Sequence, residues 1–180
     1  MLNSRELNNK NLVSIDVENV YYGYWECYNK YEGKTCRSRI ESESEVQTYI
    51  DRLKYALESG AVQVNFQKDR KVDNKRDEKF TNRYTMSQLF PDEDEVEALK
   101  RELAFLTVEE YIETVQDLRF PKRAEMRVFG REYTGEDVYI KIRVELINIT
   151  HASGNSFILV MSFHFAEKAF QDPDFPYGGK

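Results

Sequence analysis

Three side chains that suit phosphate chemistry alternate along one segment near the C-terminus. Tyr139, Lys141 and Arg143 lie two residues apart, so an extended strand would place all three on one face. Lys and Arg stabilise negative charge on phosphoryl oxygens, and a Tyr hydroxyl can donate a proton or a hydrogen bond. The alternative is the solvated face of a half-buried sheet, where the same residue types are common.

His164 is the second candidate for chemistry and lies in the largely apolar segment 161–165. Imidazole gains and loses a proton near neutral pH, so it suits a general acid or base. A histidine on a strand can equally be a packed residue with satisfied hydrogen bonds. The segments that carry Tyr139 and His164 are joined by a short loop at residues 151–155. They are therefore expected to be neighbouring strands, which allows His164 to share a face with Tyr139 and Lys141.

Further cations cluster before Tyr139 and could contact phosphates, or could be ordinary surface charge. They are Lys122, Arg123, Arg127 and Arg131. The sequence contains no P-loop, nucleophile elbow, dinucleotide fingerprint or metal-spaced His/Cys cluster. We therefore expect no cofactor and no metal site. The catalytic candidates are Tyr139, Lys141 and His164.

The strands that would position these residues are indicated by alternating apolar side chains. Residues 137–150 alternate strictly, and residues 157–165 return beside them after a hairpin loop. Shorter strands are predicted at residues 62–66 and 126–129. Residues 12–40 are predicted to form a β-hairpin that turns at Gly33.

Apolar spacing and capping residues predict three helices, which begin at Ser42, Pro91 and Thr107 and end near Gly60, Leu106 and Leu118. Residues 67–82 are predicted to be a charged loop. This order of elements predicts an α+β fold, an antiparallel sheet with helices on one face. We expect an N-terminal β-hairpin extension at residues 1–45 and one domain at residues 46–180.

Composition narrows the class of protein. The 180 residues carry a net charge of −6, with 32% charged and 41% hydrophobic residues. No stretch approaches the roughly 20 apolar residues of a membrane span, and the N-terminus lacks a signal-like apolar segment. We expect a cytoplasmic protein. Cys27 and Cys36 flank a turn and could face each other across it, but free thiols in a reducing compartment are expected.

Charge is distributed unevenly along the chain. Residues 92–117 hold ten acidic side chains and only two basic ones, whereas residues 119–180 hold nine basic and eight acidic ones. The acidic stretch is expected to be helical. It is either a solvated helical face or a surface for a protein partner that is basic.

Three motifs in order resemble the C-terminal part of MqsR-like toxins, which are similar to RelE-type endoribonucleases. They are residues 125–131 (EMRVFGR), 137–142 (DVYIKI) and 162–167 (SFHFAE), and the resemblance covers about residues 48–177. It implies a RelE/MqsR toxin-like fold and metal-independent RNA cleavage. It also places Tyr139 and Lys141 at catalytic positions, His164 where some relatives have lysine, and Arg131 where lysine usually follows Phe-Gly.

Two of the features that differ from the small toxins are the acidic net charge and the additional residues 1–45. A looser resemblance accounts for both, to acidic anti-CRISPR proteins of phages and mobile elements, some of which truncate guide RNA. We therefore expect an endoribonuclease that acts on RNA held by a protein partner with a basic surface, such as a CRISPR-Cas nuclease bound to its guide. One alternative is a toxin (mRNA interferase) of a type II toxin–antitoxin pair, with an antitoxin or the ribosome as partner. Another is a non-catalytic acidic inhibitor on the same fold.

Overall fold

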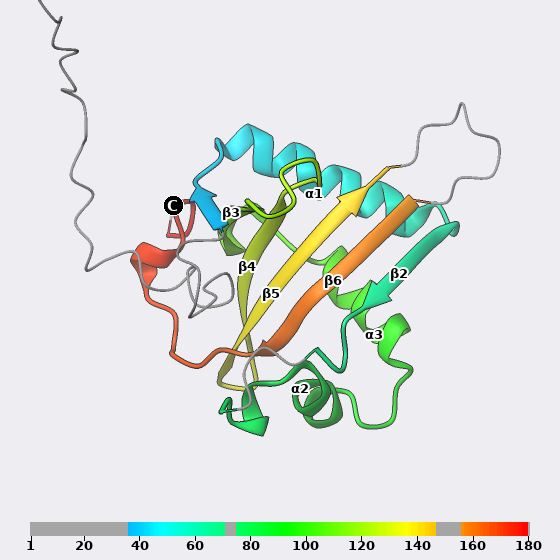
Figure 1. Cartoon of the computed structure of the whole chain (residues 1–180). Helices are drawn as coiled ribbons and strands as arrows, with labels where there is room; N and C mark the ends of the chain where they lie inside the picture. The colour runs from blue at the N-terminus through cyan, green and yellow to red at the C-terminus, as the bar shows by residue number, and fades with distance from the viewer. Residues whose placement is uncertain (1–35, 71–74, 147–155, 180) are drawn as a thin grey trace, which may run out of the picture.

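The computed structural model of the chain describes residues 36–70, 75–146 and 156–179 (Figure 1). These residues form a six-stranded sheet in the order β1-β3-β4-β5-β6-β2, together with three α-helices. Neighbouring strands are antiparallel except β2, which runs parallel to β6. The predicted α+β class is confirmed, and the sheet is antiparallel as predicted except for the pair β2–β6.

The elements have the following bounds. The strands are β1 (Cys36–Arg39), β2 (Val62–Phe66), β3 (Tyr111–Asp117), β4 (Met126–Tyr133), β5 (Glu136–Glu145) and β6 (Ser156–Phe165). The α-helices are α1 (Glu43–Glu58), α2 (Asn82–Leu89) and α3 (Glu95–Ala104). Short 3-10 turns are η1 (Glu78–Phe80), η2 (Val108–Glu110) and η3 (Asp172–Asp174).

The main core lies between the α-helices and one face of the sheet. In Figure 1, α1 and α3 lie behind the sheet and α2 lies at its lower edge. Ile50 of α1 and Leu99 of α3 are fully buried with strand residues such as Phe129, Ile140 and Phe163. Burying such side chains contributes about 1.5–3 kcal/mol each, so this layer holds the sheet in shape.

Helix α1 follows directly from its sequence signals. Ser42 caps the helix, and its side chain and that of Glu45 bond reciprocally to each other's backbone N–H groups. Val46, Ile50 and Leu53 repeat at helical spacing and are fully buried. The helix ends before Gly60, whose φ of 67° is a conformation that glycine adopts without strain.

The helix predicted from Thr107 to Leu118 is wrong, because residues 111–117 form strand β3. The predicted capping box between Thr107 and Glu110 does form, but it closes only the 3-10 turn η2. The residues that follow are rich in β-branched and aromatic types, which favour a strand that pairs on both sides. β3 pairs with β1 and β4, and its first five residues are buried.

Helix α2 lies where no helix was expected, and α3 begins at Glu95 rather than at Pro91. In α2 only Asn82, Thr85 and Met86 are buried. A helix that buries mostly polar side chains has no apolar periodicity, so the sequence carried no signal for it. The start of α3 is set by Asp94, whose side chain accepts hydrogen bonds from two backbone N–H groups.

The N-terminal part is described only from Cys36. Residues 1–35, which carry most of the predicted hairpin, lie outside the described residues. The predicted return segment contains β1, which pairs antiparallel with β3. Cys36 is disulfide-bonded, so the expectation of a free thiol is wrong for it. That expectation gave the reducing compartment more weight than the possibility that the two cysteines face each other across the turn; the other cysteine, Cys27, lies outside the described residues. Among the described helices, none has the length and apolar character needed to cross a membrane.

Candidate functional site

Tyr139 and Lys141 of β5 lie on the face of the sheet opposite the α-helices. The alternate residues Val138, Ile140 and Ile142 belong to the main core, whereas Tyr139 belongs to a separate apolar cluster on the other face. Both side chains are buried, with Tyr139 at 8% and Lys141 at 4% exposure. A solvated sheet face is therefore the wrong description of these two residues.

His164 shares this face with Tyr139 and Lys141, as the hairpin order had allowed. In the pairing of β5 with β6, Tyr139 is opposite His164 and Lys141 is opposite Ser162. The Tyr139 and His164 rings are stacked, with centroids 5.4 Å apart and planes 15° apart. His164 is 4% exposed. A phenol and an imidazole therefore touch beside a buried ammonium.

A β-bulge in β6 puts His164 on this face. The register shifts so that Lys141 is opposite Ser162 but Ile142 is opposite Val160, which leaves Met161 as an extra residue. Val160 and Phe163 consequently both belong to the main core although they are three residues apart. With strict alternation from Val160, Ser162 and His164 would point into the core.

Helix α2 holds the bulge through side chains that replace a missing neighbouring strand. β2 pairs with β6 only as far as Val160. Beyond it, the Asn82 amide donates to the Met161 carbonyl (3.1 Å) and its oxygen accepts from the Phe163 N–H (2.9 Å). The Thr85 hydroxyl accepts from the Phe165 N–H (2.8 Å). The polar face of α2 thus keeps the backbone of β6 satisfied on both sides of His164.

Replacing Asn82 by alanine is expected to lower the free energy of unfolding by about 2–4 kcal/mol. The change strips partners from buried backbone groups of β6, and each such group costs about 1–3 kcal/mol. Urea denaturation measures the effect. Asn65→Ala, at an exposed position of β2, is the matched control and should change stability by less than about 0.5 kcal/mol. Equal effects of the two variants would contradict the role assigned to Asn82.

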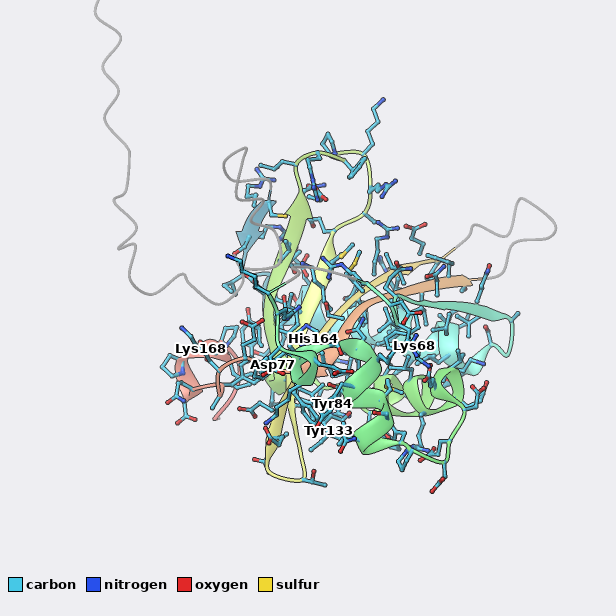
Figure 2. The ribbon with its side chains drawn as sticks, turned by 60° about the horizontal axis from the view of Figure 1, so that its bottom comes forward. Lys68, Asp77, Tyr84, Tyr133, His164 and Lys168 are labelled. Atoms are coloured by element: carbon cyan, nitrogen blue, oxygen red, sulfur yellow. The ribbon has the colours of Figure 1, made fainter. Side chains whose placement is uncertain are left out.

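Two arginines from the segment between β2 and η1 reach the same cluster. Arg70 Nη1 lies 3.5 Å from the Ser162 hydroxyl, and Arg76 Nη2 lies 3.4 Å from His164 Nε2. Arg76 also forms an ion pair with Glu167 (2.8 Å), and its side chain is 9% exposed. Figure 2 labels His164 and also Asp77, the residue that follows Arg76 in the chain.

The hydrogen bonds of His164 define which ring nitrogen carries the proton. Nδ1 lies 2.9 Å from the Phe165 carbonyl oxygen, which can only accept, so Nδ1 is assigned the N–H. In the neutral ring, Nε2 then has the lone pair and faces the Arg76 guanidinium. His164 is thus held in the tautomer of a proton acceptor at Nε2.

The C-terminal segment covers part of this face. Gly130 of β4 is opposite Tyr139, and a Cβ at Gly130 would lie 2.5 Å from the Phe170 ring. The Phe170 N–H donates to Asp137 (2.8 Å), and Phe170 and Phe175 pack against the cluster that contains Tyr139. A glycine is needed at position 130 because the aromatic ring occupies the place of a side chain.

A buried carboxylate lies in the same row of the sheet as Lys141. Glu113 of β3 is opposite Val128, and Val128 is opposite Lys141. Glu113 is 7% exposed. At the end of β3, the Arg119 side chain donates hydrogen bonds to Asp117 and holds the pKa of that carboxyl below its usual range, and the charge of Lys141 adds a smaller contribution. The positive charge of Lys141 therefore acts on the carboxylate of Asp117 at the end of β3.

Arg127 and Arg131 do not belong to this cluster, although both were candidates for phosphate contacts. They lie on the helix-side face of β4, since they alternate with Val128 and Gly130. Arg127 binds the buried carboxylate of Glu41 through Nη2 (2.6 Å) and Nε (3.0 Å). Arg131 binds Glu110 and the carbonyl oxygens of Glu102 (3.1 Å) and Phe105 (2.7 Å). Both guanidiniums bind groups of the fold itself.

The other three cationic candidates lie away from His164. Lys122 and Arg123 are exposed in the turn between β3 and β4, beyond Met126, whereas Tyr139 is opposite Gly130. Arg143 is on the same strand and face as Lys141 and forms an ion pair with Glu145 (2.7 Å).

The acidic stretch at residues 92–117 is not one helical face. It spans α3, η2 and β3, and six of its carboxylates are engaged in ion pairs with neighbouring cations. These pairs are Glu93–Arg101, Glu95–Lys68, Glu97–Lys100, Glu102–Arg101, Glu110–Arg131 and Asp117–Arg119. Much of this charge is therefore neutralised locally, which weakens the stretch as a docking surface for a basic partner.

Sequence reasoning missed Arg70, Arg76 and Ser162 as members of the cluster. The density of basic residues at positions 68–79 was visible, but nothing in it distinguished Arg76 from its neighbours. In the parts of the chain that the structure describes, no group of three His, Cys, Asp or Glu side chains could hold a metal ion. Comparison of the chain with family models, curated proteins and solved structures finds no match.

Proposed function

We propose that this protein is a metal-independent endoribonuclease that acts on RNA held by a protein partner. One observation carries the proposal, the stack of Tyr139 on His164 at 5.4 Å. Lys141 and Ser162 form the adjacent cross-strand pair, and Arg76 lies against the imidazole. Proton-transfer groups beside cations are what cleavage of a phosphodiester by its own 2′-hydroxyl requires.

The reaction would divide among these residues as follows. His164 Nε2 takes the proton of the 2′-hydroxyl as that oxygen attacks the adjacent phosphorus. Lys141, with Arg70 and Arg76, stabilises the negative charge on the five-coordinate phosphorus. The bond to the 5′-oxygen breaks, Tyr139 protonates that oxygen, and the products are a 2′,3′-cyclic phosphate and a 5′-hydroxyl.

The nature of the substrate is argued from charge. A protein with a net charge of −6 is repelled by free RNA at long range, since binding of nucleic acid depends on cationic contacts. RNA presented by a basic protein removes this difficulty. The most concrete form is the guide RNA of a CRISPR-Cas nuclease, with the residues that precede β1 as a partner-binding extension on a RelE/MqsR toxin-like domain. A toxin acting on messenger RNA would use the same chemistry without that presentation.

Burial of the cluster favours a second candidate function, a non-catalytic inhibitor on the same fold. Lys141 and His164 are each 4% exposed, and Phe170 packs beside Tyr139. A phosphodiester reaches these groups only if the covering segments move. In a pure binding protein, the cluster would serve as a polar core and its chemistry would be irrelevant.

An RNA cleavage assay in EDTA tests the proposal. Wild type and His164→Ala are incubated with bare RNA and with guide RNA loaded on a CRISPR-Cas nuclease, and Lys100→Ala, on the helix side, serves as a surface control. We expect the wild type and the control to cut in EDTA. His164→Ala should cut at least about 100-fold more slowly, as is typical for the loss of a general base.

The outcomes separate the candidates. A requirement for loaded guide supports the partner-held substrate, whereas equal cutting of bare RNA favours the toxin. If His164→Ala cuts RNA as fast as the wild type, the cluster around His164 is not the catalytic site. Absence of cutting of both substrates by a folded wild type would overturn the endoribonuclease and leave the inhibitor.

A further inference from the structure

The turn between β3 and β4, residues 118–123, is a cationic surface on an acidic protein. We name it the β3–β4 tip. Its six residues include Arg119, Lys122 and Arg123 and no carboxylate. All six are exposed. This local charge is opposite in sign to the net charge of −6 of the whole chain.

The backbone of the β3–β4 tip is held in one conformation. The Phe120 N–H donates to the Asp117 carbonyl (3.0 Å), and the Arg123 N–H donates to the Phe120 carbonyl (2.9 Å). The side-chain amide of Gln116 donates to the carbonyl oxygens of Pro121 (3.2 Å) and Arg123 (3.3 Å). Two consecutive turns are thus fastened to the end of β3. A surface organised before binding loses less entropy when a ligand arrives.

An exposed aromatic ring lies at the centre of the β3–β4 tip. Phe120 is 45% exposed, with the guanidinium carbon of Arg123 at 4.2 Å and that of Arg119 at 5.9 Å from its ring centroid. Arg119 is also bound by the carboxylate of Asp117 (2.9 and 3.0 Å). An aromatic ring flanked by cations suits the binding of single-stranded nucleic acid, because a base can stack on the ring while phosphates bind the cations.

The β3–β4 tip lies at the end of the sheet from which β4 runs toward the catalytic cluster. Lys141 is opposite Val128, two residues beyond the start of β4 at Met126. Met126 and Val128 are about 7 Å apart at roughly 3.4 Å per strand residue, and Ala124 and Glu125 lie between the tip and Met126. Val128 and Lys141 lie on the face of the sheet opposite the α-helices, where both are buried. A strand that leaves the tip along this face therefore meets Lys141 within a few nucleotides once the covering segments move.

We propose that the β3–β4 tip binds single-stranded RNA a few nucleotides from the cleavage site, with one base on Phe120 and with Lys122 and Arg123 at neighbouring phosphates. The inference rests on the proposed function, because it names a substrate contact of that same site. A membrane is a poorer occupant, since the exposed apolar side chains of the tip are essentially Leu118 and Phe120, less than an interfacial anchor buries.

Fluorescence anisotropy with a labelled single-stranded oligoribonucleotide tests the inference. All variants are made in the His164→Ala background so that binding is read without cleavage. We expect Phe120→Ala to raise Kd about tenfold, the usual effect of losing one stacked base. Lys122→Gln with Arg123→Gln should reduce the slope of log Kd against log salt by about 1.4, which corresponds to two phosphate contacts.

Matched controls lie on α1, where Tyr55 is 63% exposed and Arg52 is also exposed. Tyr55→Ala and Arg52→Gln should leave Kd unchanged. Tip variants that bind like their background, or controls that weaken binding equally, overturn the inference. So does a protein that ignores RNA but sediments with phosphatidylcholine vesicles that contain phosphatidylserine.

The experiments can overturn the tip and the proposed function independently of each other. Cleavage by the wild type together with unaffected binding by the tip variants removes the tip and leaves the proposed function. Tip-dependent RNA binding without any cleavage, bare or guide-loaded, leaves the tip and removes the endoribonuclease.

Discussion

Replacing Glu41 by glutamine is expected to lower the free energy of unfolding by about 3 kcal/mol. The Glu41 side chain is 2% exposed and accepts hydrogen bonds from Arg127 (2.6 and 3.0 Å) and Arg39 (2.8 Å). Removing one partner of a buried pair leaves the other charge uncompensated, which costs about 3–5 kcal/mol. The lower end applies because the Arg127 side chain keeps 17% exposure. Urea denaturation monitored by circular dichroism measures the change.

A double-mutant cycle shows whether the loss comes from this pair. Arg127→Met alone and together with Glu41→Gln completes the cycle, and we expect the double variant to be more stable than the sum of the two single effects by at least about 1 kcal/mol. Additive effects would show that Glu41 acts through Arg39 or through packing.

The Glu41 network also fastens the C-terminal segment. The Tyr177 hydroxyl donates to the Glu41 carbonyl, and its ring stacks on that of Tyr111, with centroids 6.2 Å apart. The same segment carries Phe170, which fills the place of a side chain at Gly130 beside Tyr139. Damage at Glu41 is therefore expected to loosen the cover of the catalytic cluster as well as the fold.

The strands that carry the site were predictable because their alternation is strict. Val138, Ile140 and Ile142 on one side, and Tyr139 and Lys141 on the other, assign the two faces of β5 without any structural knowledge. The pairing of β5 with β6 followed from the short loop between them. Together, those two inferences predicted that Tyr139, Lys141 and His164 lie on neighbouring strands.

β3 was mistaken for a helix for a physical reason. A register shift between Tyr111 and Glu113 interrupts its alternation. The apolar residues Tyr111, Ile112 and Val115 consequently fall at spacings of one, three and four, which is also the pattern of an amphipathic helix. A genuine capping box in front of them strengthened the wrong assignment.

The remaining contacts of the site are too distant in sequence for any local pattern to reveal. Arg76 and His164 are 88 residues apart, and Arg70 and Ser162 are 92 residues apart. The bulge at Met161 has no marker such as glycine in β6, and the helix that stabilises it buries polar residues. Tertiary hydrogen bonds from Asn82 and Thr85 therefore decided where His164 points.

Replacing Lys141 by methionine is expected to lower the rate of RNA cleavage at least about 100-fold, the usual effect of removing one group that stabilises charge in the transition state. Methionine keeps a flexible apolar stem in this buried position and removes only the ammonium. Lys141 is 4% exposed, and a charge acts more strongly where water is excluded. Single-turnover cleavage of guide-loaded RNA, with protein in excess, measures the chemical step.

Lys141→Arg and Lys100→Met separate catalysis from structure. Arginine keeps the positive charge but moves it and spreads it over a planar group, so we expect it to recover part of the lost rate. Lys100→Met removes a lysine that is paired with Glu97 on α3, and it should cleave at the wild-type rate. If Lys141 were merely part of a polar core, its variants would lose activity only in proportion to the fraction of protein that is unfolded. Urea denaturation of each variant gives that fraction. A Lys141→Met variant that is fully folded and cleaves within twofold of wild type would remove Lys141 from the reaction and leave His164 and Tyr139 to act with the two arginines.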